Sequence, residues 1–563
     1  MTAPHAPAVA PSPDGRPVTY FGPDFPFAYD TWIDHPAGLG RLPPERHGTE
    51  VAIIGAGAAG IIAAYELMRL GLKPVVYEAG RLGGRLRSQP FEGAEGVIAE
   101  LGGMRFPVSS TAFYRYLDRV GLETRAFPNP LDPATPSTVI DLDGQSIYVE
   151  RPEDLPPLFR EVADAWREAL EEGASFSAIQ DAMGARDVPR LKELWNRLVP
   201  IWDDRSFYDF VATSRAFASR TFRHREVFGQ VGFGTGGWDT DFPNSMLEIL
   251  RVVVTNCDEE QRLVVGGVEQ LPRRLWRRAA ERLAHWPHGT TLERLHAGAP
   301  RPGVAAIAPA GEGRFAITDR WGDTRAYPAV LVTCQSWLLT THIATDESLF
   351  AHNLWMALDR TRYMQSAKTF VMVDRPFWNE RDPATGRYRM SMTLTDRLTR
   401  GTYLFDNGPD RPAVMCLSYS WMGDALKLLP LPISQRVDLI LGALQKVYPG
   451  LDLARHIIGD PITVSWESDP NFLGAFKGAL PGHYRYNRRM YCHFMQDGLP
   501  LHERGIFLAG DDISWTPGWV EGAVTTGLNA VWGILHHLGG HTHPENPGPG
   551  DRFIELAPVA LPD

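Results

Sequence analysis

The sequence predicts an α/β fold built around a parallel sheet. The first observation is an unbroken apolar run, Val51 to Ile54, which is typical of a strand buried inside such a sheet. The second is the glycine-rich turn that follows this run and leads into a helical pattern ending near Gly71. The third is another apolar segment, Lys73 to Glu78, which completes a β-α-β unit. The 563 residues exceed one domain of about 150 residues, so we expect several structural units.

Composition and charge exclude several other classes of protein. Apolar residues make up 44% of the chain and charged residues 22%, which excludes a chain that is disordered throughout. The 54 glycines and 46 prolines indicate many turns and argue against a helical bundle. The formal net charge of −11 argues against a partner with a phosphate backbone, so no nucleic acid is expected.

The chain has the features expected of a cytoplasmic protein. Its four cysteines are widely spaced and form no C-x-x-C pair, so they predict reduced, mostly buried thiols. Residues 1–18 lack the charged start and apolar core of a signal peptide. The run from Val51 to Tyr65 is shorter than the ~18 apolar residues that suggest a membrane span. We therefore expect no association with a membrane.

The glycine-rich turn after the first strand matches the dinucleotide-binding pattern G-x-G-x-x-G. Its glycines permit a tight turn, a close approach to a pyrophosphate, and close packing of the helix on the strand. The N-terminus of that helix offers N–H groups and partial positive charge to phosphates. A carboxylate that binds ribose hydroxyls is expected about 20 residues later, where the second strand ends. The pattern alone does not separate NAD from FAD. The predicted contacts are Gly55, Gly57, Ala58, Ala59, Gly60 and Glu78.

The remaining elements follow in order along the chain. Asp143-Gly144 lies between two alternating strand patterns over residues 137–149, which predicts a β-hairpin. Residues 155–215 carry the apolar stripe of amphipathic helices. Further strands are predicted within 303–335, 364–420 and 505–509, further helices over 434–447 and from about 521 to 537, a proline-rich arm over 1–48 and a tail over 541–563.

A second candidate phosphate-binding segment directly follows Glu78. Arg81-Leu-Gly83-Gly84-Arg85 places a glycine doublet between arginines, so backbone N–H and guanidinium groups can meet a phosphate together. This pattern resembles the R-x-G-G-R segment of the flavin-dependent amine and amino-acid oxidase superfamily. The resemblance implies FAD as the cofactor, with Gly83, Gly84 and Arg85 among its contacts.

Residues 100–107 are similar to the flavin-facing segment of the L-amino-acid oxidase branch of this superfamily. The resemblance implies that Gly103, Met104 and Arg105 contact the cofactor. Arg105 is also expected to hold the substrate, because its planar fork can bind an α-carboxylate through two parallel hydrogen bonds. The alternative for Arg105 is a purely structural arginine.

The segment from Ala509 to Ala523 resembles the C-terminal flavin motif of the superfamily. The resemblance implies cofactor contacts for Asp511, which stands where many members have glutamate, and for Val520. The helix that begins near Glu521 would aim its N-terminus at the flavin. Trp519 would wall the site beside the ring as a catalytic and substrate-binding residue, the alternative being an ordinary core tryptophan.

Over about residues 17–560 the chain resembles the bacterial L-lysine 2-monooxygenases, also described as lysine oxidase/monooxygenases. Residues 21–28, 228–238, 374–378 and 476–483 carry this likeness. It implies oxidation of L-lysine with O2 to 5-aminopentanamide, CO2 and water, with a side reaction that yields a 2-oxo acid, ammonia and H2O2. An L-amino-acid oxidase and a tryptophan or phenylalanine 2-monooxygenase remain alternatives. A remote alternative is a non-enzymatic relative similar to the GDP dissociation inhibitors, which bind no flavin.

The resemblance also assigns residues on three strand-like segments. Lys368 is similar to the superfamily lysine that holds a water near the flavin, and burial would help it lose its charge. Tyr419 would join Arg105 at the α-carboxylate, while Trp421, two positions along the same strand, would line the pocket. Phe476 would pack on the substrate's methylene groups. The alternatives are a solvent-facing lysine and ordinary core aromatics.

A lysine substrate requires an acid for its distal ammonium group. The candidate acids lie within residues 238–248, which end at Glu248. From this segment we assign the role to Asp241, in a loop that leads into a helix, where a turn or helix-cap aspartate is the alternative. Cys257 follows on the same run and is expected near the pocket, the alternative being an ordinary buried thiol. No metal site is expected, because the four histidines at 536–543 fit a helix end favoured by the helix dipole.

The sequence and the resemblance together predict how the chain is divided. We expect a discontinuous FAD-binding domain of Rossmann type, a sheet-based substrate-binding domain and a helical insertion. Family members are commonly dimers, so a homodimer is expected. The predicted ranges are 49–110, 236–330 and 500–540 for the FAD-binding domain, 111–149 and 331–499 for the substrate-binding domain, and 150–235 for the insertion.

Overall fold

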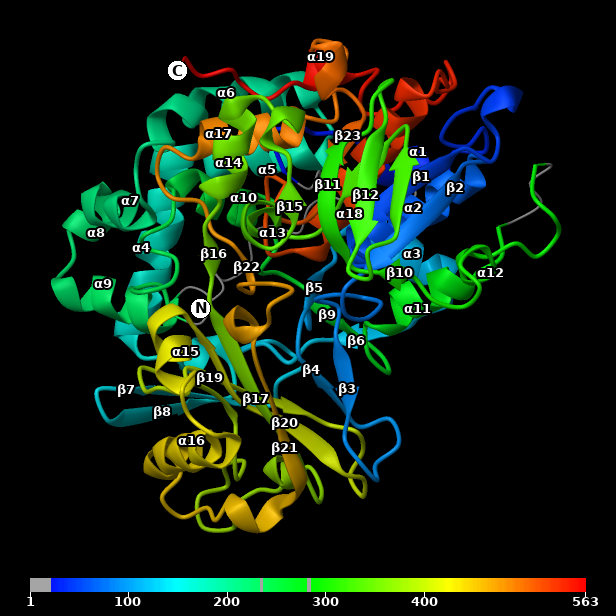
Figure 1. The fold of residues 1–563 in the computed structure, drawn as a ribbon. Helices are drawn as coiled ribbons and strands as arrows, with labels where there is room; N and C mark the ends of the chain where they lie inside the picture. Colours follow the sequence, from blue (N-terminus) through cyan, green and yellow to red (C-terminus); the bar gives the residue numbers. More distant parts are fainter. Residues whose placement is uncertain (1–21, 233–235, 281–284, 563) are drawn as a thin grey trace.

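The computed structural model describes residues 22–232, 236–280 and 285–562. A five-stranded sheet in which every neighbouring pair is parallel lies at one end of the molecule (Figure 1). Its strands are β10 (Arg301–Pro302), β2 (Lys73–Glu78), β1 (Glu50–Ile54), β14 (Val330–Val332) and β23 (Ile506–Leu508), in that spatial order. The predicted α/β fold with a parallel sheet is therefore confirmed.

Two buried helices pack together beside this sheet. Helix α2 (Ala58–Arg69) begins directly after the glycine-rich turn, and α18 (Val520–His537) crosses it closely. A Cβ atom at Gly527 would lie 3.0 Å from the carbonyl oxygen of Ala59, so the close crossing depends on a glycine there. The start of α18 agrees with the helix predicted from about residue 521.

A seven-stranded mixed sheet forms the other large layer and lies below the parallel sheet in Figure 1. Its outer strands, β7 and β8, form the predicted hairpin, and Asp143 and Gly144 both adopt positive φ as a two-residue turn of this kind requires. Helix α16 (Ile433–Val447) packs on β20 and β21. The order is β21 (Ile457–Ser465), β17 (Ser366–Val373), β20 (Ala413–Trp421), β19 (Gly401–Phe405), β18 (Met392–Thr395), β7 (Thr138–Leu142) and β8 (Gln145–Val149).

A group of helices on the left of Figure 1 corresponds to the helical stretch predicted from residue 155. In α4 the buried side chains recur at helical spacing, and Val162, Trp166 and Leu170 are among them. The helices are α4 (Pro157–Ala174), α5 (Phe176–Gly184), α6 (Val188–Trp202), α7 (Phe207–Thr213), α8 (Arg215–Ala218) and α9 (Phe222–Val227).

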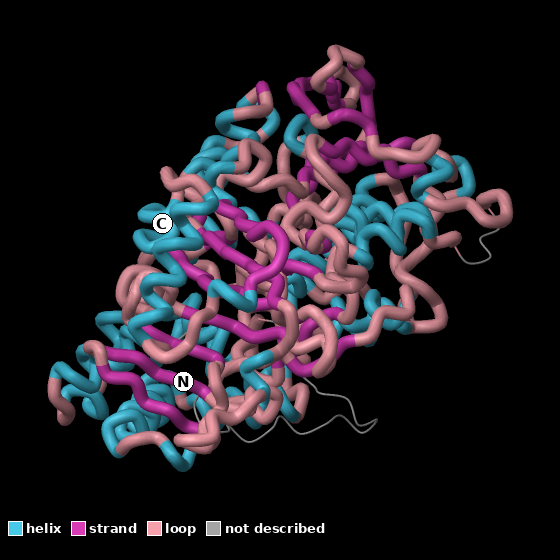
Figure 2. Tube along the Cα trace, turned by 90° about the horizontal axis from the view of Figure 1, so that it is seen from below, coloured by secondary structure: helices cyan, strands magenta, loops and turns pink. Residues whose placement is uncertain are grey.

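Shorter elements connect these layers, and Figure 2 shows the strands gathered into separate groups with helices around them. A four-stranded sheet has the order β13-β12-β11-β15, with bounds Thr324–Tyr327, Phe315–Asp319, Val304–Pro309 and Ala344–Thr345. The other strands are β3 (Ser88–Pro90), β4 (Ile98–Glu100), β5 (Phe106–Pro107), β6 (Thr124–Ala126), β9 (Gln261–Val264), β16 (Tyr363–Met364) and β22 (Phe476–Lys477). The other α-helices are α1 (Tyr29–Asp34), α3 (Thr111–Arg119), α10 (Met246–Val254), α11 (Gln270–Arg277), α12 (Leu292–Leu295), α13 (Ser336–Thr341), α14 (His352–Asp359), α15 (Met422–Leu428), α17 (Tyr484–Cys492) and α19 (Phe553–Leu556).

The described part of the predicted N-terminal arm is packed into the molecule, while residues 1–21 lie outside the described residues. Asp24 is fully buried and forms an ion pair with the buried Arg251, with 2.6 Å between Oδ2 and Nε. Lys192 donates a hydrogen bond to the Asp24 carbonyl at 2.8 Å. This segment is therefore part of the core.

The division into domains stays a prediction. One detail bears on it, since β14 belongs to the parallel sheet and crosses the predicted boundary at residue 330. Within the described ranges no helix combines the length and the apolarity needed to cross a bilayer.

Candidate active site

A cavity lies between the parallel sheet and the seven-stranded sheet. Its walls come from segments that are far apart in the sequence, including the glycine-rich turn, residues 83–86 and 102–106, and the start of α18. Most of the residues predicted for the site line it. They are Gly55, Gly57, Ala58, Ala59, Glu78, Gly83, Gly84, Arg85, Gly103, Met104, Arg105, Asp241, Lys368, Tyr419, Trp421, Phe476, Asp511, Trp519 and Val520.

At one end of the cavity the glycine-rich turn leaves space for a ligand. A Cβ atom at Gly60 would lie 2.0 Å from the carbonyl oxygen of Gly55, so this position packs against the turn itself. A Cβ atom at Gly57 would meet nothing within 4 Å, which leaves that backbone open to the cavity. Glu78 accepts hydrogen bonds from the N–H groups of Ala56 and Gly80, both at 2.7 Å, so its carboxylate is held beside the turn.

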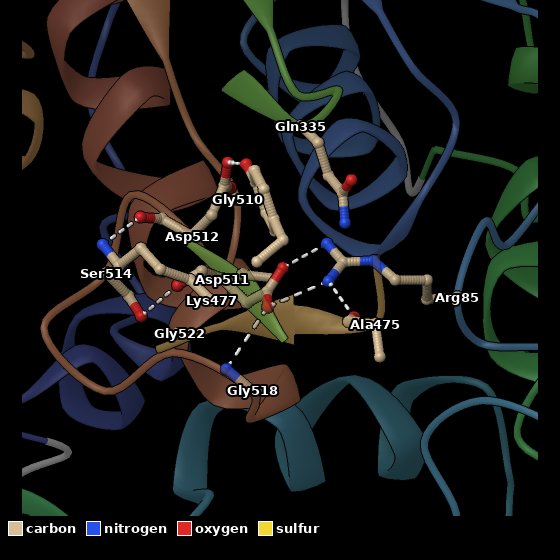
Figure 3. Close-up of polar contacts among 12 residues, drawn as sticks. Arg85, Gln335, Ala475, Lys477, Gly510, Asp511, Asp512, Ser514, Gly518 and Gly522 are labelled. Atoms are coloured by element: carbon tan, nitrogen blue, oxygen red, sulfur yellow. Dashed lines mark hydrogen bonds and ion pairs between the residues drawn. The ribbon is translucent and has the colours of Figure 1, made fainter. Parts of the chain in front are cut away.

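Arg85 and Asp511 face each other across the cavity wall (Figure 3). Arg85 donates to Asp511 through both terminal nitrogens, one of them at 3.1 Å, and also to the carbonyl oxygen of Ala475 at 2.8 Å. Gln335 lies beside this pair. Its Nε2 donates to the Gly474 carbonyl at 3.1 Å, while its buried Oε1 has no hydrogen-bond partner among the described residues. A cavity-lining acceptor of this kind suits a ligand that brings hydroxyl groups.

Arg105 lines the cavity together with Lys368 and Tyr419 of the seven-stranded sheet. Its Nη1 donates to the hydroxyl of Tyr403 at 3.4 Å, and its guanidinium lies 5.9 Å from the ring centre of Tyr419. Asp258 also lines the cavity, and the positive charge of Arg105 opposes the rise in the pKa of Asp258 that burial causes. Neither Tyr403 nor Asp258 was predicted, because no local pattern marks them and only the fold brings them to Arg105.

Lys368 is buried at 3% exposure in β17, which rules out the solvent-facing alternative. Its Nζ donates to the carbonyl oxygens of Glu100, at 3.3 Å, and of Gly102, and lies 4.7 Å from the ring centre of Tyr419. Burial lowers the pKa of Lys368 to about 8. A lysine in this state can lose its proton near neutral pH, which suits proton exchange in the cavity.

Aromatic side chains form another wall. The ring centres of Tyr419 and Trp421 are 5.4 Å apart, and those of Trp421 and Phe476 are 5.3 Å apart, both in edge-to-face contact. Trp519 lies at the N-terminal cap of α18 and lines the same cavity. These four rings give the cavity an apolar side suited to an aliphatic or aromatic substrate chain.

Carboxyl groups gather on the α10 side of the cavity. Asp241 is 8% exposed and accepts a hydrogen bond from the Thr240 hydroxyl at 3.1 Å. Burial raises the pKa of Asp241 to about 7. Glu248, which lies in the same candidate segment but was not chosen, and Asn244, which was not predicted, line the cavity together with Asp241.

Two predicted residues do not line the cavity. Gly60 is buried behind the turn, where it packs the helix on the strand. Cys257 is fully buried and contacts the hydroxyl of Thr255 at 2.9 Å, and burial raises the pKa of its thiol, as in an ordinary buried cysteine. The described part of the chain contains no group of three or more His, Cys, Asp or Glu residues arranged to hold a metal ion.

Residues 58–535 match the family of flavin-containing amine oxidoreductases. The chain belongs to this family. The match covers the seven-stranded sheet, every strand of the parallel sheet except β1, and most of the cavity lining, and the family implies FAD as the cofactor class.

Curated relatives of the chain act on an amino acid. It is 32% identical to the tryptophan 2-monooxygenase of Pseudomonas savastanoi over 545 residues, which is 91% of this chain and 93% of that protein. It is 31% identical to the tryptophan 2-monooxygenase of Pantoea agglomerans pv. gypsophilae, covering 92% and 93%. It is 25% identical to the flavin-dependent L-tryptophan oxidase of Lentzea aerocolonigenes, covering 86% and 98%.

Solved structures of amine oxidases share the fold. A variant of putrescine oxidase superposes with a TM-score of 0.66 at 19% identity, covering 87% of this chain and 99% of that one. Cyclohexylamine oxidase from Brevibacterium oxydans gives a TM-score of 0.63 at 17% identity, with the same coverage. The predicted α/β fold of amine oxidase type is thus confirmed, and the chain is a flavin-dependent oxidoreductase of amines or amino acids.

Proposed function

We propose that the protein is an FAD-dependent monooxygenase/oxidase of L-α-amino acids. FAD, when bound, would accept a hydride from Cα as the Cα–N bond becomes an imine, and would pass the two electrons to O2. The residues fit this cofactor: Gly57 leaves the pyrophosphate side open, Glu78 offers a carboxylate to a ribose, and the free acceptor of Gln335 suits a hydroxyl.

The proposal for the substrate's amino-acid end rests on Arg105. Its guanidinium is set between the hydroxyl of Tyr403 and the ring of Tyr419, so its fork is oriented for a carboxylate. Lys368 has a pKa of about 8 and two backbone acceptors, which lets it hold or release one proton close to the reacting end. Trp519 and the other aromatic side chains exclude water from this region.

The single observation that favours a cationic side chain is Asp241. A buried carboxyl at the cavity wall costs free energy when charged and unpaired, and a substrate ammonium would offset that cost. We infer that L-lysine is the preferred substrate. Oxidation by one O2 with loss of CO2 gives 5-aminopentanamide and water, while early release of the imino acid gives the 2-oxo acid, ammonia and H2O2.

Tryptophan is the second candidate substrate, because the named relatives act on it. The ring wall of Trp421 and Phe476 suits an indole, but an indole leaves Asp241 without a charged partner. A homodimer, expected from the resemblance, is tested by light scattering.

Anaerobic mixing of the purified holoenzyme with L-lysine, L-norleucine and L-tryptophan tests the substrate proposal. We expect L-lysine to bleach the flavin absorbance fastest, and 5-aminopentanamide to appear after air is admitted. Faster bleaching by L-tryptophan would show that L-lysine is not the preferred substrate, while the proposed class of reaction would stand. Bound flavin that no L-amino acid bleaches would overturn the proposal.

A further inference from the structure

Glu248 stands at a position whose local spacing also fits a structural role. Ser245-Met-Leu-Glu248 at the start of α10 matches the capping box S-x-x-E, in which the glutamate would accept the N–H of Ser245. In the structure the Ser245 N–H instead donates to the carbonyl of Ala479 at 2.8 Å. The Glu248 carboxylate accepts the N–H of Ala479 at 2.5 Å. The backbone of Ala479 therefore takes the place of the reciprocal hydrogen bond between Ser245 and Glu248. The Glu248 side chain lines the cavity.

Four charged side chains face Glu248. Lys477 comes from β22, Arg251 from α10 itself, Arg362 from the segment before β16, and Asp241 from the turn before α10. Arg251 is already paired with Asp24, and Arg362 donates to the Asn244 side chain at 2.6 Å.

Of these three cations, Lys477 lowers the pKa of Glu248 most. It is buried at 2% exposure, and its Nζ donates to the carbonyl oxygen of Asp512. The carboxyls of Asp512 and Asp511 and the guanidinium of Arg251 also face this ammonium, and His483 lies close to it. Lys477 thus stands between the acids of the α10 side and the turn that carries Asp511.

The two cavity-lining acids of the α10 side lack a full counter-charge. Burial raises the pKa of both Asp241 and Glu248 to about 7, and the nearby carboxyls of Asp258 and then Glu248 add to the rise for Asp241. The described part of the chain gives neither carboxyl an ion pair. A cation that enters this end of the cavity would be stabilised by both carboxylates.

We propose that Glu248 is a second specificity-determining residue that binds the substrate's distal cation together with Asp241, and that Lys477 is a positioning residue that keeps Glu248 charged. This inference rests on the proposed oxidation of cationic L-amino acids. The resemblance to other proteins does not assign these roles to Glu248 and Lys477.

The first experiment uses 6-aminohexanoate and hexanoate, which differ in the distal ammonium and carry no α-amine to oxidise. Isothermal titration of the holoenzyme at pH 7.5 should give at least tenfold tighter binding of 6-aminohexanoate. In Glu248→Gln, which keeps the acceptor for Ala479, this preference should fall about tenfold while hexanoate binds as before. Equal binding of both probes by the unchanged protein would overturn the proposed cationic substrate and this inference with it. A preference that survives Glu248→Gln intact would overturn only the role of Glu248.

The second experiment measures how the affinity for 6-aminohexanoate depends on pH. Removal of the ammonium in Lys477→Met should raise the pKa of Glu248, so the pH at which affinity rises should move upward by about one unit. Lys477→Arg keeps the positive charge and should restore the original pH profile. A merely structural role for Lys477 would not shift this profile. Lys192→Met is the matched control, since Lys192 is also buried and bonded to backbone carbonyls but lies outside the cavity lining. An unchanged profile in Lys477→Met, or the same shift in Lys192→Met, would contradict the role of Lys477.

Discussion

Arg85 and Asp511 form a two-pronged ion pair that joins the glycine-doublet segment to the segment before α18. Arg85 also donates to the carbonyl of Ala475, so one guanidinium holds three segments at the cavity wall. Both residues were predicted as separate cofactor contacts, and in the structure they also pair with each other.

Asp511→Asn should weaken both the fold and FAD binding. The substitution leaves the Arg85 guanidinium partly buried without its counter-charge, which costs about 3 kcal/mol of unfolding free energy. Denaturant unfolding of the apoprotein and FAD content after purification measure the two effects. Arg85→Met should rescue part of the loss in the double variant, and strictly additive losses would show that the two residues do not act as a pair.

Arg105→Lys should slow reduction of the flavin by substrate while FAD stays bound. A lysine keeps the charge but not the planar fork, so the α-carboxylate is held in the wrong place, at a cost of about 10²-fold in rate. Rapid-mixing absorbance under anaerobic conditions measures this rate. An unchanged rate would remove Arg105 from the carboxylate site.

Lys368→Met should remove one limb from the pH dependence of the reaction. The pKa of Lys368 is lowered to about 8, so the neutral amine that can accept a proton accumulates as the pH rises through 8. The unchanged protein should therefore react faster above pH 8. The variant should be slow, and its rate should depend on pH only through the ionisation of the substrate's α-amine. Separate pH profiles of flavin reduction and of reoxidation by O2 identify the affected step, and two unaltered profiles would refute the assignment.

Asp241→Ala should cost turnover of L-lysine about 10²-fold and turnover of L-norleucine much less, because only lysine carries a distal charge. The pKa of Asp241 is raised to about 7, so the carboxylate is present above pH 7 and is lost as the pH falls below it. The kcat/KM for L-lysine should accordingly fall on acidification from pH 8 to pH 6, whereas that for L-norleucine should not show this limb. Equal losses on both substrates would exclude Asp241 as the selecting acid.

Two alanine substitutions in the glycine-rich turn should separate folding from cofactor binding. Gly60→Ala forces a methyl group to within 2.0 Å of the Gly55 carbonyl and should destabilise the protein by about 3 kcal/mol or more. Gly57→Ala meets no protein atom within 4 Å and should fold normally, with FAD affinity reduced about tenfold because the methyl group enters the cavity. Thermal unfolding and titration of the apoprotein with FAD distinguish the two. A normally stable Gly60→Ala would show that this turn is looser than the structure indicates.

The parts of the molecule that the sequence predicts well depend on neighbours in the chain. The turn around Gly55, the spacing to Glu78 and the hairpin at Asp143 each need only a few consecutive residues, so their patterns are visible in one sequence. Asp258 and Tyr403 leave no such pattern, since they become site residues only when distant segments meet at Arg105. Cys257 was placed near the pocket from its neighbours, and its side chain turned out to be buried against Thr255.

The local pattern around Glu248 fits a contact that the fold does not form. The spacing of Glu248 from Ser245 is that of a capping box, and nothing nearby indicates that residue 479 takes over the helix start. The burial of Lys368 was equally beyond local reasoning, because an alternating strand has two faces and only the packing of the sheet decides which face meets water. Contacts between residues far apart in the sequence, not local propensity, decide the surroundings of Glu248 and Lys368.

The strand order of the parallel sheet has a consequence for synthesis in the cell. β23 is an edge strand of this sheet, and it reaches β14 only after some five hundred residues have left the ribosome. Until then β14 exposes an unpaired edge, which invites pairing with another chain. Residues 510–523 are the last cavity-lining residues to be synthesised, so the complete cavity forms only when translation is nearly finished.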